Sequence, residues 1–224
     1  MTILLETRGI RLADQHFQRR VATQLVKISS ILETAAFNFD HVHSTLERAA
    51  QEFIDSDDDI VVTEHGVQGN RIFTFVDTTN GSIVQVPVRY TSTQPSVANL
   101  TRTRPEGYVI PRTYADLASR LSDSGVEVQT LPYEFDGSVE VLNITSVRFG
   151  QGYDEGTVPV TVSTEAYRKK ILLPAGSFWV SARQRYAGLA FATLEPESRD
   201  GYVTFGILPV AVGSDYPIFR VPRD

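Results

Sequence analysis

Residues 1–10 read MTILLETRGI, and this stretch determines how the rest of the chain can be organised. An apolar run at residues 3–5 leads to a carboxylate, Glu6, and then to a guanidinium, Arg8. Gly9 ends the run, and a long helical pattern follows at once. The pattern predicts a strand that presents Glu6 and Arg8 in front of a helix, as α/β domains do where they build a site at their strand ends. Because so little chain precedes this strand, we expect most of any domain built on it to lie outside these residues.

The composition is that of an ordinary globular protein, with 42% hydrophobic and 21% charged residues among 224. A formal net charge of -6 argues against a nucleic-acid partner and against an anionic membrane surface. No apolar run approaches the ~20 residues that a membrane-spanning helix needs. The amino terminus lacks the basic start and the long apolar core of a signal peptide.

The sequence is compatible with more than one cellular compartment. There is no cysteine, so the chain has neither a disulfide framework nor a thiolate metal site. Two acceptor triplets for N-glycosylation, Asn99-Leu100-Thr101 and Asn143-Ile144-Thr145, permit an extracellular location. Such triplets also arise by chance, so they do not establish secretion.

Residues 13–39 have the pattern of one long amphipathic helix. Apolar side chains recur every three or four residues, at Phe17, Val21, Leu25, Ile28, Leu32, Ala35 and Phe39. Asp14 suits the N-cap, and the length favours packing along a sheet. A second helical pattern covers about 41–54 and runs into the acidic residues of 55–59. Acid at a helix C-terminus opposes the macrodipole, so we interpret 55–59 as a solvated linker and a domain boundary.

From residue 60 onwards the apolar period changes from that of a helix to that of strands. The turn Thr79-Asn80-Gly81-Ser82 between two alternating runs predicts a β-hairpin. A strand at 108–110, a helix at 114–122 capped by Gly125, and a strand at 126–131 form a compact unit. Further expected strands cover 139–149, 158–162, 170–173, 178–180, 202–208 and 219–221, with a helix at 187–194. The whole chain is therefore expected to be α+β.

Two other groups of residues were weighed as sites. His43 and Glu47 share a helix face and could hold a metal weakly, although a surface ion pair is the better interpretation. Arg102 and Arg104 could bind a carboxylate, but two loop arginines are more often solvated.

Several stretches together resemble the zinc carboxypeptidases of peptidase family M14, in their longer microbial form with an extra carboxy-terminal region. These stretches are Leu5-Glu6-Thr7-Arg8-Gly9-Ile10, residues 15–22, residues 103–111, Gly125-Val126-Glu127-Val128, residues 173–177 and residues 194–198. The resemblance implies an α/β catalytic domain whose zinc is held by a His-x-x-Glu pair and a later His. It further implies that Glu6 is the general base, which takes a proton from the zinc-bound water, and that Arg8 gives electrostatic support.

The zinc ligands that the resemblance implies are missing from this sequence. None of the four histidines is followed three residues later by Glu. In the family these ligands precede the Glu6 motif, as do the residues that hold the carboxylate of the peptide substrate. We therefore expect residues 1–56 to be the end of a carboxypeptidase catalytic domain and 60–224 to be a β-rich accessory region. Zinc and peptidase activity would then belong to a longer parent, and this chain alone would be inactive and free of metal.

A non-catalytic β-rich binding or structural module is the alternative to an enzyme fragment. In either case the 13–39 helix carries five large apolar side chains whose burial is worth about 10 kcal/mol. We expect this helix to dock on an upstream catalytic domain or elsewhere in the chain, to mediate self-association, or to be poorly ordered.

Overall fold

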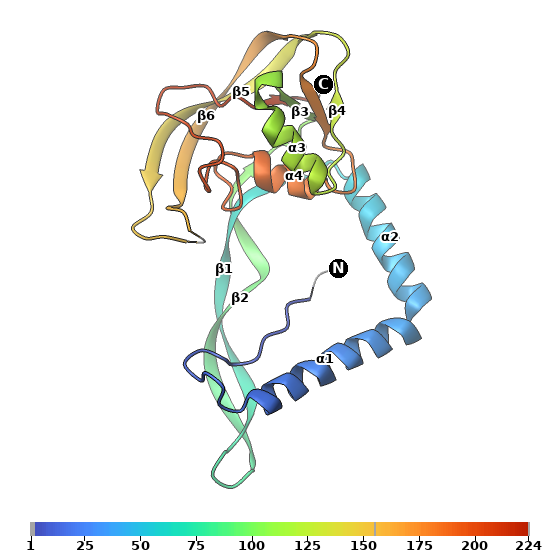
Figure 1. Cartoon of the computed structure of the whole chain (residues 1–224), viewed down its shortest axis with the longest axis vertical. Coiled ribbons are helices and arrows are strands. Elements are labelled where there is room, and N and C mark those ends of the chain that lie inside the picture. Colours follow the sequence, from blue (N-terminus) through green and yellow to red (C-terminus); the bar gives the residue numbers. More distant parts are fainter. Residues whose placement is uncertain (1–2, 155, 224) are drawn as a thin grey trace. The chain divides into compact units, whose positions relative to one another are not determined.

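The computed structural model describes residues 3–154 and 156–223, and its contacts divide the chain into two compact units (Figure 1). Unit 1 is Met1–Asp55 and unit 2 is Ser56–Asp224. The chain has both helices and sheets, as expected of an α+β protein. In the described part, no helix is long and apolar enough to cross a membrane. The assignment of 1–56 to a catalytic remnant and of 60–224 to an accessory region stays a prediction.

Unit 1 contains two helices, α1 (Phe17–Phe37) and α2 (Phe39–Asp55). Asn38 separates them. Its backbone N–H and its Nδ2 atom both donate to the Thr34 carbonyl oxygen, at 3.1 and 2.8 Å, so they satisfy the last turn of α1. The prediction of two helices is confirmed, and the break lies one residue before the end of the predicted 13–39 helix.

The start of α1 differs from the prediction. Two tight turns precede the helix, in which the Leu12 N–H donates to the Gly9 carbonyl and the Gln15 N–H donates to the Leu12 carbonyl. His16 occupies the N-cap position with a φ of 55°, in the left-handed region. The prediction that Asp14 caps the helix is wrong, because α1 begins three residues after it and no side chain caps the helix.

The expected strand before the helix is also absent. In the described part of unit 1, residues 3–9 have no strand partner and no regular secondary structure. Side chains of α1 bond this segment instead: Gln24 Nε2 donates to the Leu5 carbonyl at 3.2 Å, and Lys27 Nζ donates to the Glu6 carbonyl at 2.8 Å. A strand needs a neighbour for its backbone groups, and unit 1 offers none.

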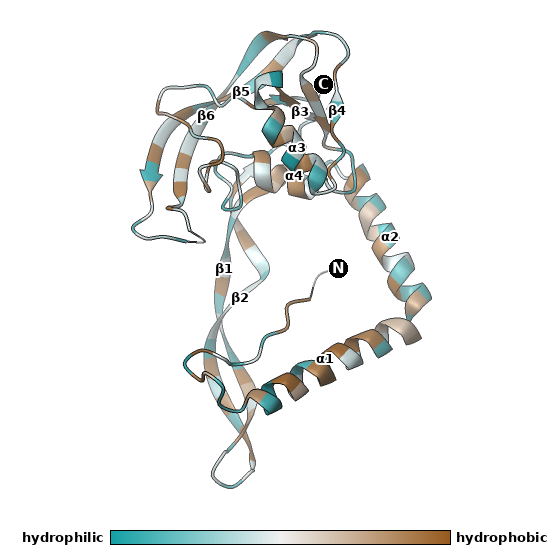
Figure 2. Ribbon diagram, in the orientation of Figure 1, coloured by the Kyte–Doolittle hydropathy of each residue, from teal (hydrophilic) through white to brown (hydrophobic). Residues whose placement is uncertain are grey.

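The apolar stripe of α1 is exposed within unit 1. Figure 2 shows the hydrophobic bands along the helix, and the described residues of α1 include none that is buried. The exposed members are Phe17, Val21, Leu25, Ile28 and Leu32. The described residues of unit 1 form no sheet, so the expected packing of this helix along one is not found among them.

Unit 2 is built on a six-stranded sheet with the order β4-β7-β3-β8-β5-β6, in which all neighbours are antiparallel. Its strands are β3 (Gly107–Ile110), β4 (Gln129–Thr130), β5 (Phe135–Phe149), β6 (Val160–Leu173), β7 (Phe178–Ser181) and β8 (Phe219–Val221). Two helices accompany it, α3 (Ala115–Asp123) after the short 3-10 helix η1 (Arg112–Tyr114), and α4 (Ala187–Leu194).

Side chains alternate between the two faces of this sheet, and both faces carry buried apolar residues. Tyr108 and Ile110 of β3 belong to the main core together with α3 and α4, whereas Val109 between them belongs to a smaller cluster on the other face. The main core includes Leu117 and Leu121 of α3, Ala187, Ala190, Phe191 and Leu194 of α4, and Leu142, Ile144, Val162 and Val180 of the sheet.

The predicted strand-helix unit around α3 is largely confirmed. Leu117, Ala118 and Leu121 are buried, as their spacing predicts. Gly125 follows the helix with a φ of 90°, and the Val126 N–H reaches back to the Leu121 carbonyl at 3.0 Å. The strand expected at 126–131 is shorter than predicted, since only β4 pairs with a neighbour, β7.

A long two-stranded ribbon precedes the six-stranded sheet. It consists of β1 (Ile60–Val76) and β2 (Ile83–Arg102), joined at the predicted turn, where Gly81 has a φ of 77°. Ile60, at the start of β1, is buried in the main core, whereas Ile72 and Ile83 near the turn are exposed. The ribbon therefore leaves the core at one end and is open to solvent at the other.

One expected strand is replaced by turns. Residues 202–208 form no strand, although Tyr202, Val203 and Leu208 are buried in the main core. The Tyr202 N–H donates to the Thr193 carbonyl and the Leu208 N–H donates to the Tyr202 carbonyl, so this backbone bonds to α4 and to itself. Its apolar residues indicated burial correctly, but the segment forms turns, and only the Val160 N–H at the start of β6 donates to its Thr204 carbonyl.

The difference between buried and exposed leucines on β5 and β6 gives a first prediction. We expect Leu142→Ala to lower the free energy of unfolding of unit 2 by about 2–5 kcal/mol, because the substitution opens a cavity in the main core. Leu142 is 1% exposed. Urea unfolding followed by the fluorescence of Trp179, the one tryptophan of the chain, measures the change.

Leu172→Ala is the matched control. Leu172 lies on β6 and is 63% exposed, so the same substitution should change the unfolding midpoint little. Equal losses in the two variants would contradict the assignment of the core.

Candidate functional site

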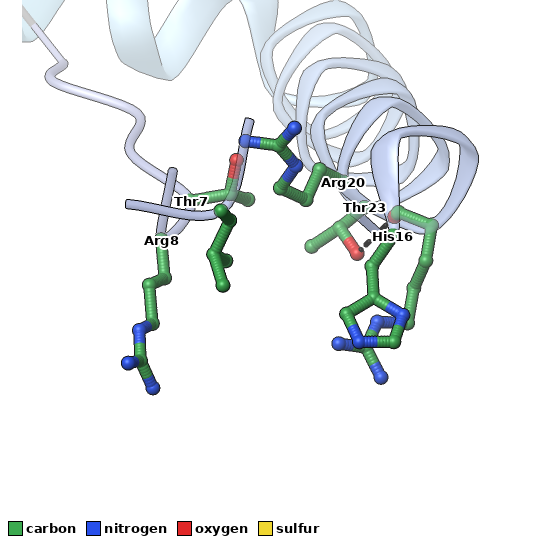
Figure 3. Close-up of a pocket in the computed structure, with 7 residues that line it drawn as sticks. Thr7, Arg8, His16, Arg20 and Thr23 are labelled. Carbon is green, nitrogen blue, oxygen red and sulfur yellow. Dashed lines mark hydrogen bonds between the residues drawn. The ribbon is translucent and has the colours of Figure 1, made fainter. Parts of the chain in front are cut away.

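The segment that carries Glu6 and Arg8 borders two open hollows in unit 1. One is lined by Leu5, Glu6, Thr7, Arg8, Gly9, Ile10, Arg11, Leu12 and Gln24. The other is lined by Thr7, Arg8, Leu12, His16, Arg19, Arg20 and Thr23. Figure 3 shows the side chains of Arg8 and His16 extending to the same side of the second hollow, with Arg20 on the opposite side. Glu6 and Arg8 thus border the same hollow, and four arginines, Arg8, Arg11, Arg19 and Arg20, line the two hollows together.

Glu6 and Arg8 are both exposed. No described residue forms a hydrogen bond or ion pair with the Glu6 carboxylate, although the Glu6 backbone oxygen is held by Lys27 Nζ. Among the described residues of unit 1, none holds a reacting group against this carboxylate.

Metal ligands do not converge anywhere in the described part of the chain. No group of three or more His, Asp and Glu side chains there could hold a metal ion. The His43 ring stacks on Phe39 with centroids 5.7 Å apart, and His65 Nδ1 lies 2.6 Å from Asn99 Oδ1. The residues present therefore do not fit a zinc site.

The acidic run after α2 includes a carboxylate that forms ion pairs with residues distant in sequence. Within unit 2, the Asp57 carboxylate pairs with the guanidinium groups of Arg183 and Arg223. These hydrogen bonds, first that of Arg183, hold the pKa of Asp57 below its usual value. Asp57 is exposed, as the interpretation of 55–59 as a solvated linker predicts, and it also has long-range partners that the local pattern does not reveal.

A buried cluster of charged side chains lies where the ribbon meets the sheet of unit 2. Arg102, the last residue of β2, donates to both carboxylate oxygens of Glu197, from Nη1 at 2.9 Å and from Nη2 at 2.8 Å. Its Nη1 also donates to Glu195 at 3.0 Å, and its Nη2 donates to Thr164 of β6 at 2.8 Å. One planar guanidinium thus connects the ribbon, β6 and the residues that follow α4.

Glu195 is the centre of this cluster and is 1% exposed. Its Oε1 atom accepts a hydrogen bond of 2.7 Å from the Tyr108 hydroxyl and lies 2.9 Å from Arg220 Nε. Arg220, on β8, also pairs with Glu140 on β5 and donates to the Thr103 carbonyl. The cluster therefore reaches strands β3, β5 and β8.

The charges of the cluster do not balance. Three carboxylates, Glu140, Glu195 and Glu197, face two guanidinium groups, Arg102 and Arg220. Burial raises the pKa of Glu195 to about 7, against the opposing effects of Arg102 and Tyr108. Glu195 is thus the group that takes up a proton when the balance is restored.

The expectation that Arg102 and Arg104 are solvated is wrong. Arg104 is also buried; it donates to the Ala182 carbonyl at 2.6 Å and lies over the Phe191 ring. The sequence pattern did not predict that Glu195 belongs to a buried cluster. One signal for it was available, because Glu195 directly follows the apolar helix Ala187–Leu194 and so shares its buried position.

The raised pKa of Glu195 predicts a pH-dependent stability. Between its ordinary value of 4.5 and about 7, the folded protein binds a proton that the unfolded chain has lost. The free energy of unfolding should therefore fall as the pH rises from about 5 to about 8, by on the order of 2–4 kcal/mol. Urea unfolding at several pH values, followed by Trp179 fluorescence, measures this slope.

Glu195→Gln should flatten the slope, because glutamine stays neutral throughout. Glu165→Gln is the control, since Glu165 is an exposed residue of β6 beside Thr164 and should leave the slope unchanged. A slope in Glu195→Gln equal to that of the wild type would contradict the assignment to Glu195.

Known proteins are similar in sequence to nearly the whole chain. The chain is 45% identical over 221 residues to Carboxypeptidase 2 of Trichophyton equinum, an alignment that covers 99% of the chain. It is 44% identical over 221 residues to Carboxypeptidase 2 of Trichophyton rubrum, and 43% identical over 216 residues to Probable carboxypeptidase 2 of Arthroderma benhamiae. No family model and no solved structure matches the chain.

These relatives are considerably longer than the chain. The alignments cover 41% of the Trichophyton equinum and Trichophyton rubrum proteins and 40% of the Arthroderma benhamiae protein. The chain is therefore homologous to a portion of proteins named carboxypeptidase 2, and it spans about two fifths of their length.

Proposed function

We propose that this chain is the carboxy-terminal part of a zinc metallocarboxypeptidase of peptidase family M14, a parent protein that hydrolyses the C-terminal peptide bond of a peptide substrate. The supporting observation is that the similarity to carboxypeptidase 2 proteins covers 99% of the chain and so reaches the stretch that carries Glu6. The sequence resemblance of residues 5–10 to the general-base motif agrees with this proposal.

In this proposal Glu6 is the general base. A carboxylate in contact with the attacking water can take its proton, and such a group contributes about 10²–10⁴-fold to the rate. The exposed position of Glu6 and the absence of a described partner for its carboxylate are compatible with this role. Arg8, which borders the same hollow, would support the site electrostatically.

The remaining parts of the active centre would come from the portion of the parent that this chain does not contain. That portion would supply the zinc ligands and the residues that hold the substrate carboxylate. The exposed apolar face of α1 would then pack against the upstream catalytic domain; without that domain, it is the surface through which copies of the chain would self-associate.

A non-catalytic role for unit 2 follows from its own architecture. Residues 56–223 have a complete sheet, two helices and a buried core. Unit 2 would accordingly act as a structural accessory region of the parent.

Substitution of the proposed base is the most direct test of the enzyme proposal. In the longer protein encoded by the reading frame that runs through Met1, Glu6→Gln should lower kcat for a peptide substrate by about 10²–10⁴-fold and leave the fold intact. Glu33→Gln, on the exposed surface of α1, should keep full activity. A reading frame that encodes no His-x-x-Glu upstream of Met1, or full activity in Glu6→Gln, would contradict the proposal.

The isolated chain gives a second, independent expectation. The purified 224 residues should bind no zinc at one equivalent and should release no amino acid from a peptide, since the described residues form no metal site. Calorimetric titration with zinc and a peptidase assay measure the two properties. Tight one-to-one zinc binding would overturn the view that the ligands lie elsewhere in the parent.

A further inference from the structure

The two acceptor triplets for N-glycosylation lie in very different surroundings. Asn99 is on β2 in the ribbon, and Asn143 is on β5 in the six-stranded sheet. An N-linked oligosaccharide is bulky and hydrophilic, so it is compatible with a folded protein only where the asparagine amide nitrogen faces solvent. The surroundings of the two amide nitrogens therefore decide which triplet can carry a glycan in the folded protein.

The Asn143 side chain is held by hydrogen bonds within the folded protein. It is half-buried, and its Nδ2 atom donates to Asp215 Oδ1 at 3.1 Å and to the Gly213 carbonyl at 3.3 Å. Asp215 also accepts hydrogen bonds from Tyr167 and Lys169, so it belongs to a larger polar network. A sugar on Asn143 Nδ2 would displace Asp215 and the loop that carries it.

The Asn99 side chain is exposed, and so is Thr101, the hydroxyl residue of its triplet. Asn99 lies at an irregularity of the ribbon, because Thr63 pairs with Leu100 while Glu64 pairs with Ala98, so Asn99 itself has no residue opposite. In the described structure its Oδ1 atom contacts His65, and its Nδ2 atom makes no hydrogen bond. The amide nitrogen of this exposed side chain therefore has no hydrogen bond to lose on modification.

We propose that Asn99 is an N-glycosylation site of this protein and that Asn143 is not occupied in the folded protein. The donor is a lipid diphosphate-linked oligosaccharide whose first sugar is N-acetylglucosamine. The Asn99 amide nitrogen attacks C1 of that sugar and loses a proton, the new C–N bond forms, and the bond from C1 to the diphosphate oxygen breaks. The lipid diphosphate leaves, and the amide oxygen keeps its contact with His65.

Folding explains why the two triplets should differ although both satisfy the same sequence rule. An Nδ2 atom that carries a sugar keeps only one hydrogen, so in a chain modified at Asn143 it cannot donate to both Asp215 and the Gly213 carbonyl. A chain modified at Asn99 loses no described hydrogen bond. The inference rests only on these two environments and is independent of the proposed enzymatic function.

Expression behind a secretory leader in a eukaryotic host tests the proposal. Both the medium and the cell extract are treated with peptide-N-glycosidase and analysed by peptide mass spectrometry. We expect the secreted chain to carry one glycan, on Asn99, and to shift to lower mass after treatment. Asn99→Gln and Thr101→Ala should each abolish this shift, because each destroys the triplet at a different residue.

Thr145→Ala is the matched control for Thr101→Ala and should leave the shift unchanged. The absence of a glycan on Asn99 in both medium and extract would overturn the proposal. A glycan on Asn143 of secreted protein that resists proteolysis would overturn it as well, because such protein is folded.

Discussion

The ion cluster around Arg102 is the interaction on which the organisation of unit 2 depends. The Arg102 guanidinium group donates hydrogen bonds to Glu195, Glu197 and Thr164, and it lies where the ribbon enters the core. Removing one partner from a buried pair typically costs about 3–5 kcal/mol, because the other charge stays buried without compensation. The cluster therefore makes the end of the ribbon, the end of α4 and strand β6 mutually dependent. A solvent-exposed pair of the same kind would contribute little.

The two units differ in how much of their apolar surface they bury. Unit 2 has buried apolar residues on both faces of its sheet and packs helices α3 and α4 against one of them. Unit 1 has helices of clear amphipathic pattern, yet the apolar face of α1 is open within the unit. A helix in water draws most of its stability from packing of its apolar face. This contrast agrees with the proposal that unit 1 belongs to a larger domain and that unit 2 stands on its own.

Local patterns predicted the fold well where neighbours in sequence decide the structure. The α3 helix with its Gly125 cap, the turn at Asn80-Gly81 and helix 187–194 all follow from spacing and turn chemistry. Prediction failed where distant partners decide. Residues 3–9 and 202–208 have strand-like composition, but a strand exists only where another strand lies beside it. Arg102 and Glu195 are 93 residues apart, so no local pattern could join them. The roles of Glu6 and Arg8 follow from a family resemblance, because neither side chain has a hydrogen-bonding or ionic partner among the described residues.

Strand order in the sheet has a consequence for how unit 2 is made during protein synthesis. β8 is the last strand in sequence order, but in space it lies between β3 and β5 and carries Arg220 of the ion cluster. While residues 219–221 are still being added, β4, β7 and β3 cannot join β5 and β6. Until then the nascent unit consists of two separate β segments with exposed edge strands. Exposed edge strands favour aggregation. Completion of the sheet, including entry of Arg220 into the core, can only follow translation of this final strand.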